Sequence, residues 1–298
     1  MTFYTTNICP IGVKIWTCNI FTCVLHVGAM IWAVYEILTG NDWKVPVLTS
    51  SLVWRERSTK NGHSCQMGNC FVRNELVTFS SLPSISLLGL VIAFHALSFS
   101  WQFLALFKNP VQDYYVADML RGRNGLRWLE YGLSAPLMIV VIAAVLSIVD
   151  VFVFLLLALC TMVLMMLGYM QEVLMAHTTL PHCAGWVIFI GNWIVLSLAF
   201  VLGIYSGDTP PPWSVVQYIV YVYASMLFLF GGFGIVQMWH VFHLMSASNA
   251  PKKNRRVCFE KVELTYAALS LSSKFILGAL LTLLIRSRKE TFNLTLAI

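Results

Sequence analysis

The chain alternates between long apolar segments and shorter polar ones. Seven apolar segments are each about 20 residues or longer and cover residues 13–38, 82–107, 124–148, 151–175, 184–205, 215–245 and 261–285. A helix of about 20 apolar residues is long enough to cross the hydrocarbon core of a bilayer. The pattern therefore predicts an all-α membrane protein, a seven-transmembrane helix bundle that forms a single domain over residues 1–298.

The longest polar segment, residues 39–81, connects the first two spans. Within it, residues 45–54 and 70–79 are rich in Val, Leu, Phe and Thr, so we expect a small β-hairpin in this loop. Cys65 and Cys70 bracket a polar stretch of the same loop. In an oxidising compartment they could form a disulfide, and a pair of free thiols is the alternative.

Composition supports a membrane protein and argues against several other classes. Only 11% of the residues are charged, whereas soluble domains carry about 25%. The net charge of +6 comes from basic residues beside the apolar segments, which is typical of loops that face lipid headgroups. We therefore expect the lipid bilayer as a partner and no nucleic acid. The eight cysteines have no zinc-like spacing, so we expect no metal site.

The distribution of basic residues also predicts the orientation of the bundle in the membrane. Apart from Lys274, ten of them lie on the side of the N-terminus and eight on the other side. Because cytoplasmic loops carry more Lys and Arg, the N-terminus is predicted to be cytoplasmic, in the plasma membrane. Loop 39–81 and the short polar tail, residues 286–298, would then be extracellular. The tail contains a glycosylation sequon at Asn293.

Lys274 is an ionisable residue near the middle of the last span. About ten residues, or roughly 15 Å of helix, separate it from either end, which is too far for its side chain to reach water comfortably. Such a residue is a functional candidate because its burial is costly unless it is paired. It is either a lysine in an ion pair or beside an aqueous path, or an amine that condenses with an aldehyde.

Glu130, in the third span, is the natural partner of Lys274. Glu130 and Ser134 lie four residues apart and therefore share one helix face, as do Ser270 and Lys274. A protonated Schiff base in a low dielectric needs one nearby anion and a few hydroxyl groups. These residues supply both.

These two motifs resemble those of the heliorhodopsins, within the microbial-type rhodopsins. The third span reads RWLEY at residues 127–131, followed by Ser134 and Met138, and the seventh reads LSLSSK at residues 269–274. The resemblance extends over nearly the whole chain at the level of seven spans and a long first loop. It departs from the family at Gly132, where a serine is common, and at Asn192, where a proline is usual. Those departures bear on pocket shape and spectral tuning.

The resemblance implies that all-trans retinal is bound to Lys274 as a protonated Schiff base, with Glu130 as sole counterion. It also implies a homodimer and an inverted topology with a cytoplasmic N-terminus. His26 and His95 would form a proton-accepting polar cluster near the Schiff base. The residues implied around the polyene, besides Ser134 and Ser270, are Tyr131, Met138, Trp193, Phe230 and Gln237.

Two positions argue against an outward proton pump. Pumps that resemble bacteriorhodopsin have a second carboxylate four residues before the lysine, where this chain has Ser270. They have a proton-donor carboxylate about three turns after the counterion, where this chain has Val141. We therefore expect a light sensor, not an enzyme, that signals through slow conformational change to an unknown signalling protein.

Two alternatives stay open. One is a light-gated passive proton conductance, for which acidic residues near the span ends would carry protons. Solvated helix ends are the simpler interpretation of these residues. The other alternative is a retinal-free transporter or receptor in which Lys274 pairs with Glu130. The acidic residues in question are Glu36, Asp150, Glu172, Glu260 and Glu263.

Overall fold

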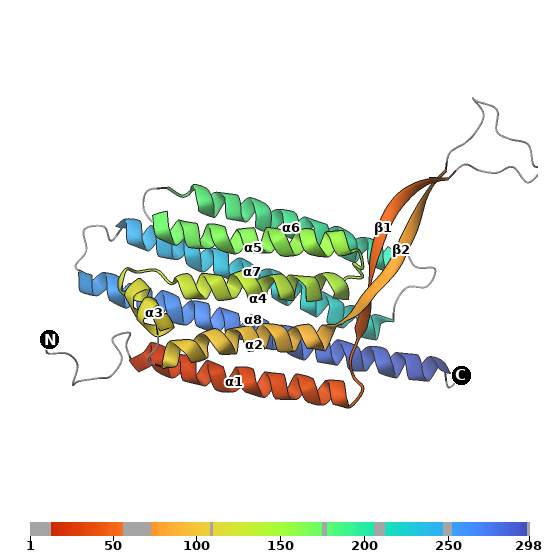
Figure 1. Cartoon of the computed structure of the whole chain (residues 1–298), viewed down its shortest axis with the longest axis horizontal. Coiled ribbons are helices and arrows are strands. Elements are labelled where there is room, and N and C mark those ends of the chain that lie inside the picture. Colours follow the sequence, from red (N-terminus) through yellow and green to blue (C-terminus); the bar gives the residue numbers. More distant parts are fainter. Residues whose placement is uncertain are drawn as a thin grey trace, which may run out of the picture.

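The computed structural model describes residues 13–55, 73–107, 110–174, 178–205, 212–246 and 252–296. Seven long helices run side by side as a bundle, and a two-stranded sheet projects from one end (Figure 1). The elements follow in the order α1 (Val13–Leu38), β1 (Lys44–Arg55), β2 (Arg73–Ser86), α2 (Leu87–Leu106), α3 (Pro110–Leu120), α4 (Gly125–Val145), α5 (Val151–Leu174), α6 (Leu180–Tyr205), α7 (Trp213–Ser246) and α8 (Lys252–Leu296).

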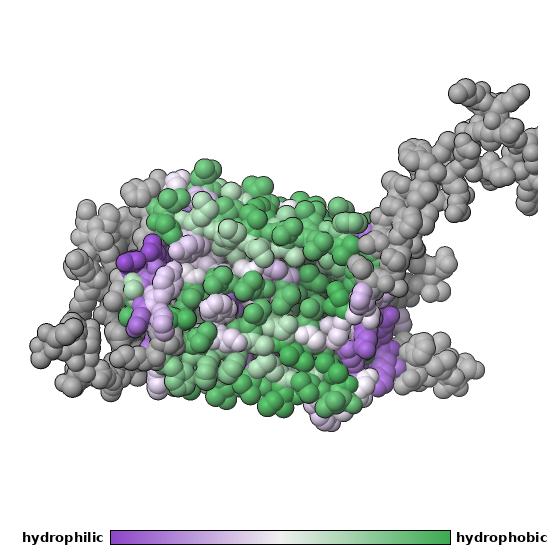
Figure 2. Space-filling model, viewed as in Figure 1, coloured by the Kyte–Doolittle hydropathy of each residue, from purple (hydrophilic) through white to green (hydrophobic). Residues whose placement is uncertain are grey.

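The described residues include seven helices that are long and apolar enough to cross a membrane, all but the short α3. In the space-filling view a broad apolar band covers the visible face of the bundle, and hydrophilic residues gather at its two ends (Figure 2). The apolar band places the bundle in a lipid bilayer as an integral, multi-pass membrane protein. The predicted seven-helix fold with a small β-hairpin is confirmed.

The hairpin is longer than predicted. β1 and β2 are antiparallel, and β2 continues to Ser86, which pairs with Lys44. The predicted start of the second span at residue 82 is therefore wrong by five residues. The helix begins only at Leu87 because the Ser86 hydroxyl caps it, accepting a hydrogen bond from the Gly89 N–H at 2.8 Å. Cys65 and Cys70 lie outside the described residues.

The base of the hairpin is fixed to the bundle. Val45 and Val47 are buried in its apolar core. The Leu48 N–H donates to the Val149 carbonyl at 2.9 Å, which joins β1 to the connection between α4 and α5. We refer below to this end of the bundle as the hairpin side, and to the end where α1 begins as the N-terminal side.

The last helix also extends beyond its predicted span. The predicted short tail, residues 286–298, is helical as far as Leu296. Two of its polar residues have partners on α1 and in the turn that follows it. The Arg286 guanidinium pairs with the Glu36 carboxylate, and Lys289 Nζ donates to Asn41 Oδ1 at 3.1 Å. These contacts join the start of this extension to the end of α1.

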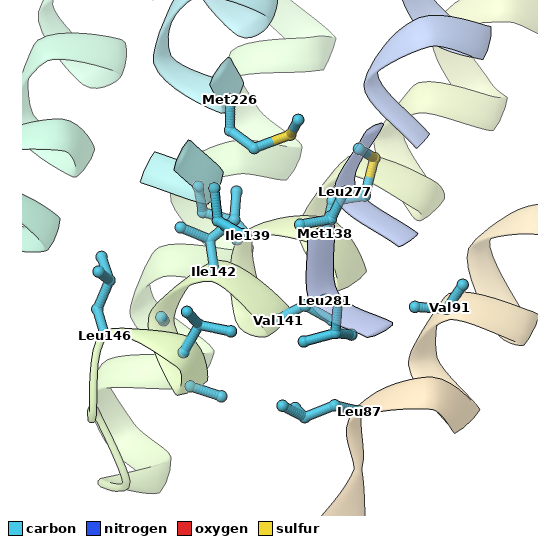
Figure 3. Close-up of a cluster of buried hydrophobic side chains, with 14 of the residues drawn as sticks. Leu87, Val91, Met138, Ile139, Val141, Ile142, Leu146, Met226, Leu277 and Leu281 are labelled. Carbon is cyan, nitrogen blue, oxygen red and sulfur yellow. The ribbon is translucent and has the colours of Figure 1, made fainter. Parts of the chain in front are cut away.

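A cluster of buried aliphatic and methionine side chains fills part of the bundle (Figure 3), and in α8 its members lie on the hairpin side of Lys274. Leu277 and Leu281 follow Lys274 by about one and two turns of α8 and are fully buried. They pack with residues of α2, α4 and α7 in one continuous cluster. We call this cluster the aliphatic core; its labelled members are Leu87, Val91, Met138, Ile139, Val141, Ile142, Leu146, Met226, Leu277 and Leu281.

Candidate functional site

The site is centred on an ion pair between α8 and α4. Lys274 is only 1% exposed, and its Nζ donates to Glu130 Oε1 at 2.6 Å and to Ser270 Oγ at 2.8 Å. Among the described carboxylates, only that of Glu130 forms an ion pair with Lys274. The predicted pairing of Lys274, Glu130 and Ser270 is therefore present in the geometry. Burial makes the attraction between the two charges much stronger than it would be in water.

One carboxylate oxygen collects three donors. Besides Lys274, Glu130 Oε1 accepts a hydrogen bond from Ser134 Oγ at 3.0 Å and one from Ser98 Oγ at 2.5 Å. Ser134 was expected from the sequence, whereas Ser98, on α2, was missed. Ser98 follows His95 by three residues and so shares its helix face, which is the signal that could have indicated it.

His26 and His95 also come together, from α1 and α2. Their Nδ1 atoms lie 2.8 Å apart and both rings are buried, so one Nδ1 donates and the other accepts. The Phe275 ring, adjacent to Lys274 in the chain, lies 5.3 Å from the His95 ring and 6.4 Å from the His26 ring. The two histidines thus form one polar pair beside the residue that follows Lys274.

An apolar cavity of about 290 Å³ adjoins Lys274 between α4, α5, α7 and α8. Tyr131 and Met138 line it from α4, and Phe230 lines it from α7. These three residues were expected around an apolar ligand. Ser134 and Ser270 also line this cavity, at the end near the ion pair.

A second cavity, of about 450 Å³, continues the first between α5, α6 and α7. The two share Met165, Phe230 and Phe233 as lining residues. Gln237 lines the second cavity, and its Nε2 donates to the Gly168 carbonyl at 2.7 Å. The ligand space is therefore elongated, with Lys274 at one end.

Trp193 differs from the other expected lining residues. It lines neither cavity, and its ring centroid lies 6.4 Å from that of Phe230. It packs with the aliphatic core from α6. Trp193 therefore supports the cavity wall from behind rather than forming its surface.

Two glycines differ in how closely they are packed, and one of them, Gly132, is a departure from the family pattern. A Cβ atom at Gly168 would lie 2.3 Å from the Trp128 ring, so the close packing of that ring on α5 requires glycine there. A Cβ atom at Gly132 would meet nothing within 4 Å. Gly132 lines neither cavity, so its departure from the family pattern does not alter the space beside Lys274.

The acidic residues near the span ends are mostly not solvated. Glu36, Glu172 and Glu263 are buried, so the simpler interpretation of these three is wrong. Burial is possible because each faces a guanidinium: Arg127 pairs with both Glu172 and Glu263. Asp150 does fit the simpler interpretation, since it caps the start of α5 by accepting from backbone N–H groups at 2.8 and 3.2 Å.

The arrangement suits one kind of ligand. A buried amine with an anion beside it can hold a carbonyl compound as a charged imine, and the elongated apolar space can accommodate a long hydrocarbon chain. A family model described as heliorhodopsin matches residues 15–281, a range that includes all the residues of this site. A comparison with curated proteins gave no match.

Proposed function

Since the chain belongs to the heliorhodopsin family, the light-sensing membrane proteins with a retinal chromophore, we propose that it is a photoreceptor that carries all-trans retinal on Lys274. We propose further that it signals through a slow conformational change and does not pump ions. The absence of ion pumping rests on one observation, the aliphatic core on the hairpin side of Lys274 (Figure 3).

Several residues fit the chromophore. When bound, retinal supplies the absorption of visible light and the isomerisation of a double bond. Lys274 holds it through its Nζ atom, and Glu130, 2.6 Å from that atom, balances the positive charge on the nitrogen. Ser98 and Ser134 hold the carboxylate in place and spread its charge. The apolar side chains of the two cavities exclude water from the chain of the ligand.

The histidine pair can accept the proton that the Lys274 nitrogen gives up. Both rings are buried, and among the described residues His26 Nε2 has no hydrogen-bond partner. A proton on this pair can be shared across the 2.8 Å contact between the two Nδ1 atoms. His26 and His95 therefore supply a place for the proton inside the protein, close to where it leaves.

The aliphatic core argues against transport across the membrane. Val141, Leu277 and Leu281 are fully buried and fill the space between α4 and α8. A proton that moves toward the hairpin side would need polar groups or water along its path, and closely packed aliphatic side chains provide neither. Val141 also occupies the position at which a pump would carry its donor carboxylate.

Reconstitution with all-trans retinal tests the chromophore directly. The purified protein should form a visible absorbance band, and Lys274→Ala should abolish it. The ion pair by itself is also compatible with a retinal-free transporter or receptor. Absence of a band, or a band of unchanged intensity in Lys274→Ala, would favour that alternative.

Voltage clamp under illumination separates a sensor from a proton conductance. We expect no stationary photocurrent at any holding potential. A current whose reversal potential follows the pH gradient would instead establish the light-gated conductance. The same cells should show the visible band, so that lack of current is not mistaken for lack of retinal.

Orientation and assembly complete the proposal. The ten basic residues on the N-terminal side against eight on the other support a cytoplasmic N-terminus and an extracellular C-terminus in the plasma membrane. Labelling of an epitope at either terminus in intact cells tests this orientation. The homodimer and the unknown signalling partner stay predictions from the resemblance, and cross-linking in membranes tests the dimer.

A further inference from the structure

A second buried group of charges lies at the N-terminal side of the bundle. Arg127, at the start of α4, forms ion pairs with Glu172 near the end of α5 and with Glu263 in the early part of α8. His240 of α7 lies beside them, with its Nδ1 atom 3.9 Å from Glu172 Oε1. None of the four is more than 7% exposed. We call these four residues the charged cluster.

The charges of this cluster do not balance with one arginine. Two ionised carboxylates against a single guanidinium leave a net charge of −1. A buried, uncompensated charge costs several kcal/mol, which binding of one proton removes. The proton can sit on Glu172, on Glu263 or on His240; in the last case two cations face two anions.

Among the described side chains, the neighbouring groups do not supply the missing positive charge. Asn124 donates from its backbone N–H to Glu172 Oε2 at 3.1 Å and from its side-chain Nδ2 to Glu263 Oε2 at 2.9 Å. From α8, the Tyr266 ring lies 4.0 Å below the Arg127 guanidinium, and its hydroxyl is buried without a partner among the described residues. From α3, Asp118 pairs outward with Arg123. All these contacts are neutral or already paired.

A partly open cavity with both polar and apolar walls extends from the charged cluster to the partners of Lys274. Its volume is about 630 Å³ including space open to solvent, and its lining includes Glu130 and Ser270 at one end and Arg127 and Glu263 at the other. The lining also includes Gln102 of α2, whose Oε1 atom is buried without a partner among the described residues. The polar groups on its walls, one of them unsatisfied, favour water, and a chain of waters carries protons.

We propose that the charged cluster is a proton-binding site that holds one proton in the dark and gives it to Glu130 in the light. The second half rests on the proposed function. When the Lys274 nitrogen loses its proton to the histidine pair, Glu130 becomes a buried anion without its cation. A new O–H bond then forms on Glu130, and an O–H or N–H bond breaks in the cluster. Water in the cavity relays the proton between them.

The dark half is testable without retinal. Infrared difference spectra between acid and alkaline samples of the retinal-free protein should show one buried acid losing its proton, as a carboxyl or an imidazolium band. Glu172→Gln removes one negative charge and should abolish that band. Glu263→Gln removes the same charge from another helix and should act identically, which keeps the test available if one variant does not fold.

Glu36→Gln is the matched control. Glu36 is as buried as Glu172 but pairs one to one with Arg286, so it binds no excess proton. Its replacement should leave the band unchanged. An unchanged band in both Glu172→Gln and Glu263→Gln, or loss of the band in Glu36→Gln, would overturn the proton-binding site.

The light half uses the retinal-loaded protein. A flash should produce a carboxyl C=O band that Glu130→Gln removes, and Glu172→Gln should also lack it. If the band persists in Glu172→Gln, the cluster is not the proton donor. If no visible absorbance forms at all, the proposed function fails, while the dark titration still decides whether the cluster binds a proton.

Discussion

Glu130→Gln offers the sharpest test of the electrostatics around Lys274. With retinal bound as proposed, the positive charge in the ground state would be concentrated on the Lys274 nitrogen, and excitation would move it along the polyene, away from the carboxylate. Glu130 therefore stabilises the ground state more than the excited state. Replacement by glutamine keeps the shape but removes the negative charge, so the absorbance band should shift to the red.

The size of this shift has an upper limit set by the geometry. With Nζ and Oε1 2.6 Å apart, Coulomb attraction at an effective dielectric constant of about 20 is on the order of 6 kcal/mol. The red shift in excitation energy should be a fraction of that value, because the charge is only partly displaced. Absorbance spectra of the retinal-loaded wild type and variant at the same pH measure it.

Ser98→Ala supplies a control of opposite sign. The Ser98 hydroxyl donates to the same carboxylate oxygen at 2.5 Å, and hydrogen bonds to charged groups contribute roughly 1.5–3 kcal/mol. Its loss concentrates negative charge near the nitrogen, so the band should shift to the blue, by less than Glu130→Gln shifts it to the red. An unshifted band in Glu130→Gln would refute the reasoning and place the counterion elsewhere.

Three further predictions concern helix packing, proton acceptance by the histidine pair and the barrier that the aliphatic core forms. Gly168→Ala should lower the free energy of unfolding in detergent by about 1–3 kcal/mol, because its methyl group would overlap the Trp128 ring. Gly132→Ala should be neutral or stabilise the protein by up to about 1 kcal/mol. Equal effects of the two substitutions would contradict the close packing of Trp128 on Gly168. His95→Phe should keep the visible band but slow its recovery after a flash at least tenfold, and an unchanged recovery rate would exclude the histidine pair as the proton acceptor. Leu281→Asn places a polar group in the aliphatic core and should produce a photocurrent that the wild type lacks. A wild-type photocurrent of equal size would show that the aliphatic core does not block proton movement.

Hydropathy and helix periodicity carried the sequence analysis as far as single helices. The seven spans follow from length and composition, and the approach of Lys274 to Glu130 follows from the scarcity of other charges at that depth. The start of α2 was placed too early because residues 82–86, Leu-Pro-Ser-Ile-Ser, suit a strand and also the first turn of a helix, where proline is tolerated. Only the pairing of these residues with β1 decides between the two, and that is a tertiary contact.

Contacts between helices explain what the sequence missed in the site. Glu172 and Glu263 each stand near the end of a span, where water is the expected partner. Arg127, from a third helix, reaches both, and nothing in the local sequence of any of the three indicates this. Ser98 is similar, because its role depends on α2 lying beside α4. The sequence reveals the residue that is costly to bury more readily than the neighbours that make its burial tolerable.

The two halves of the bundle together explain how proton exchange and the absence of transport can coexist. On the N-terminal side of Lys274, a cavity lined in part by polar groups reaches the charged cluster. On the hairpin side, the aliphatic core fills the space (Figure 3). A proton that leaves the cluster for Glu130 must therefore be replaced from the same side of the membrane. Each light cycle then displaces charge within the protein and restores it. Voltage clamp should accordingly record a brief transient after a flash, whose integral returns to zero, and a net charge per flash would mean that a path crosses the aliphatic core.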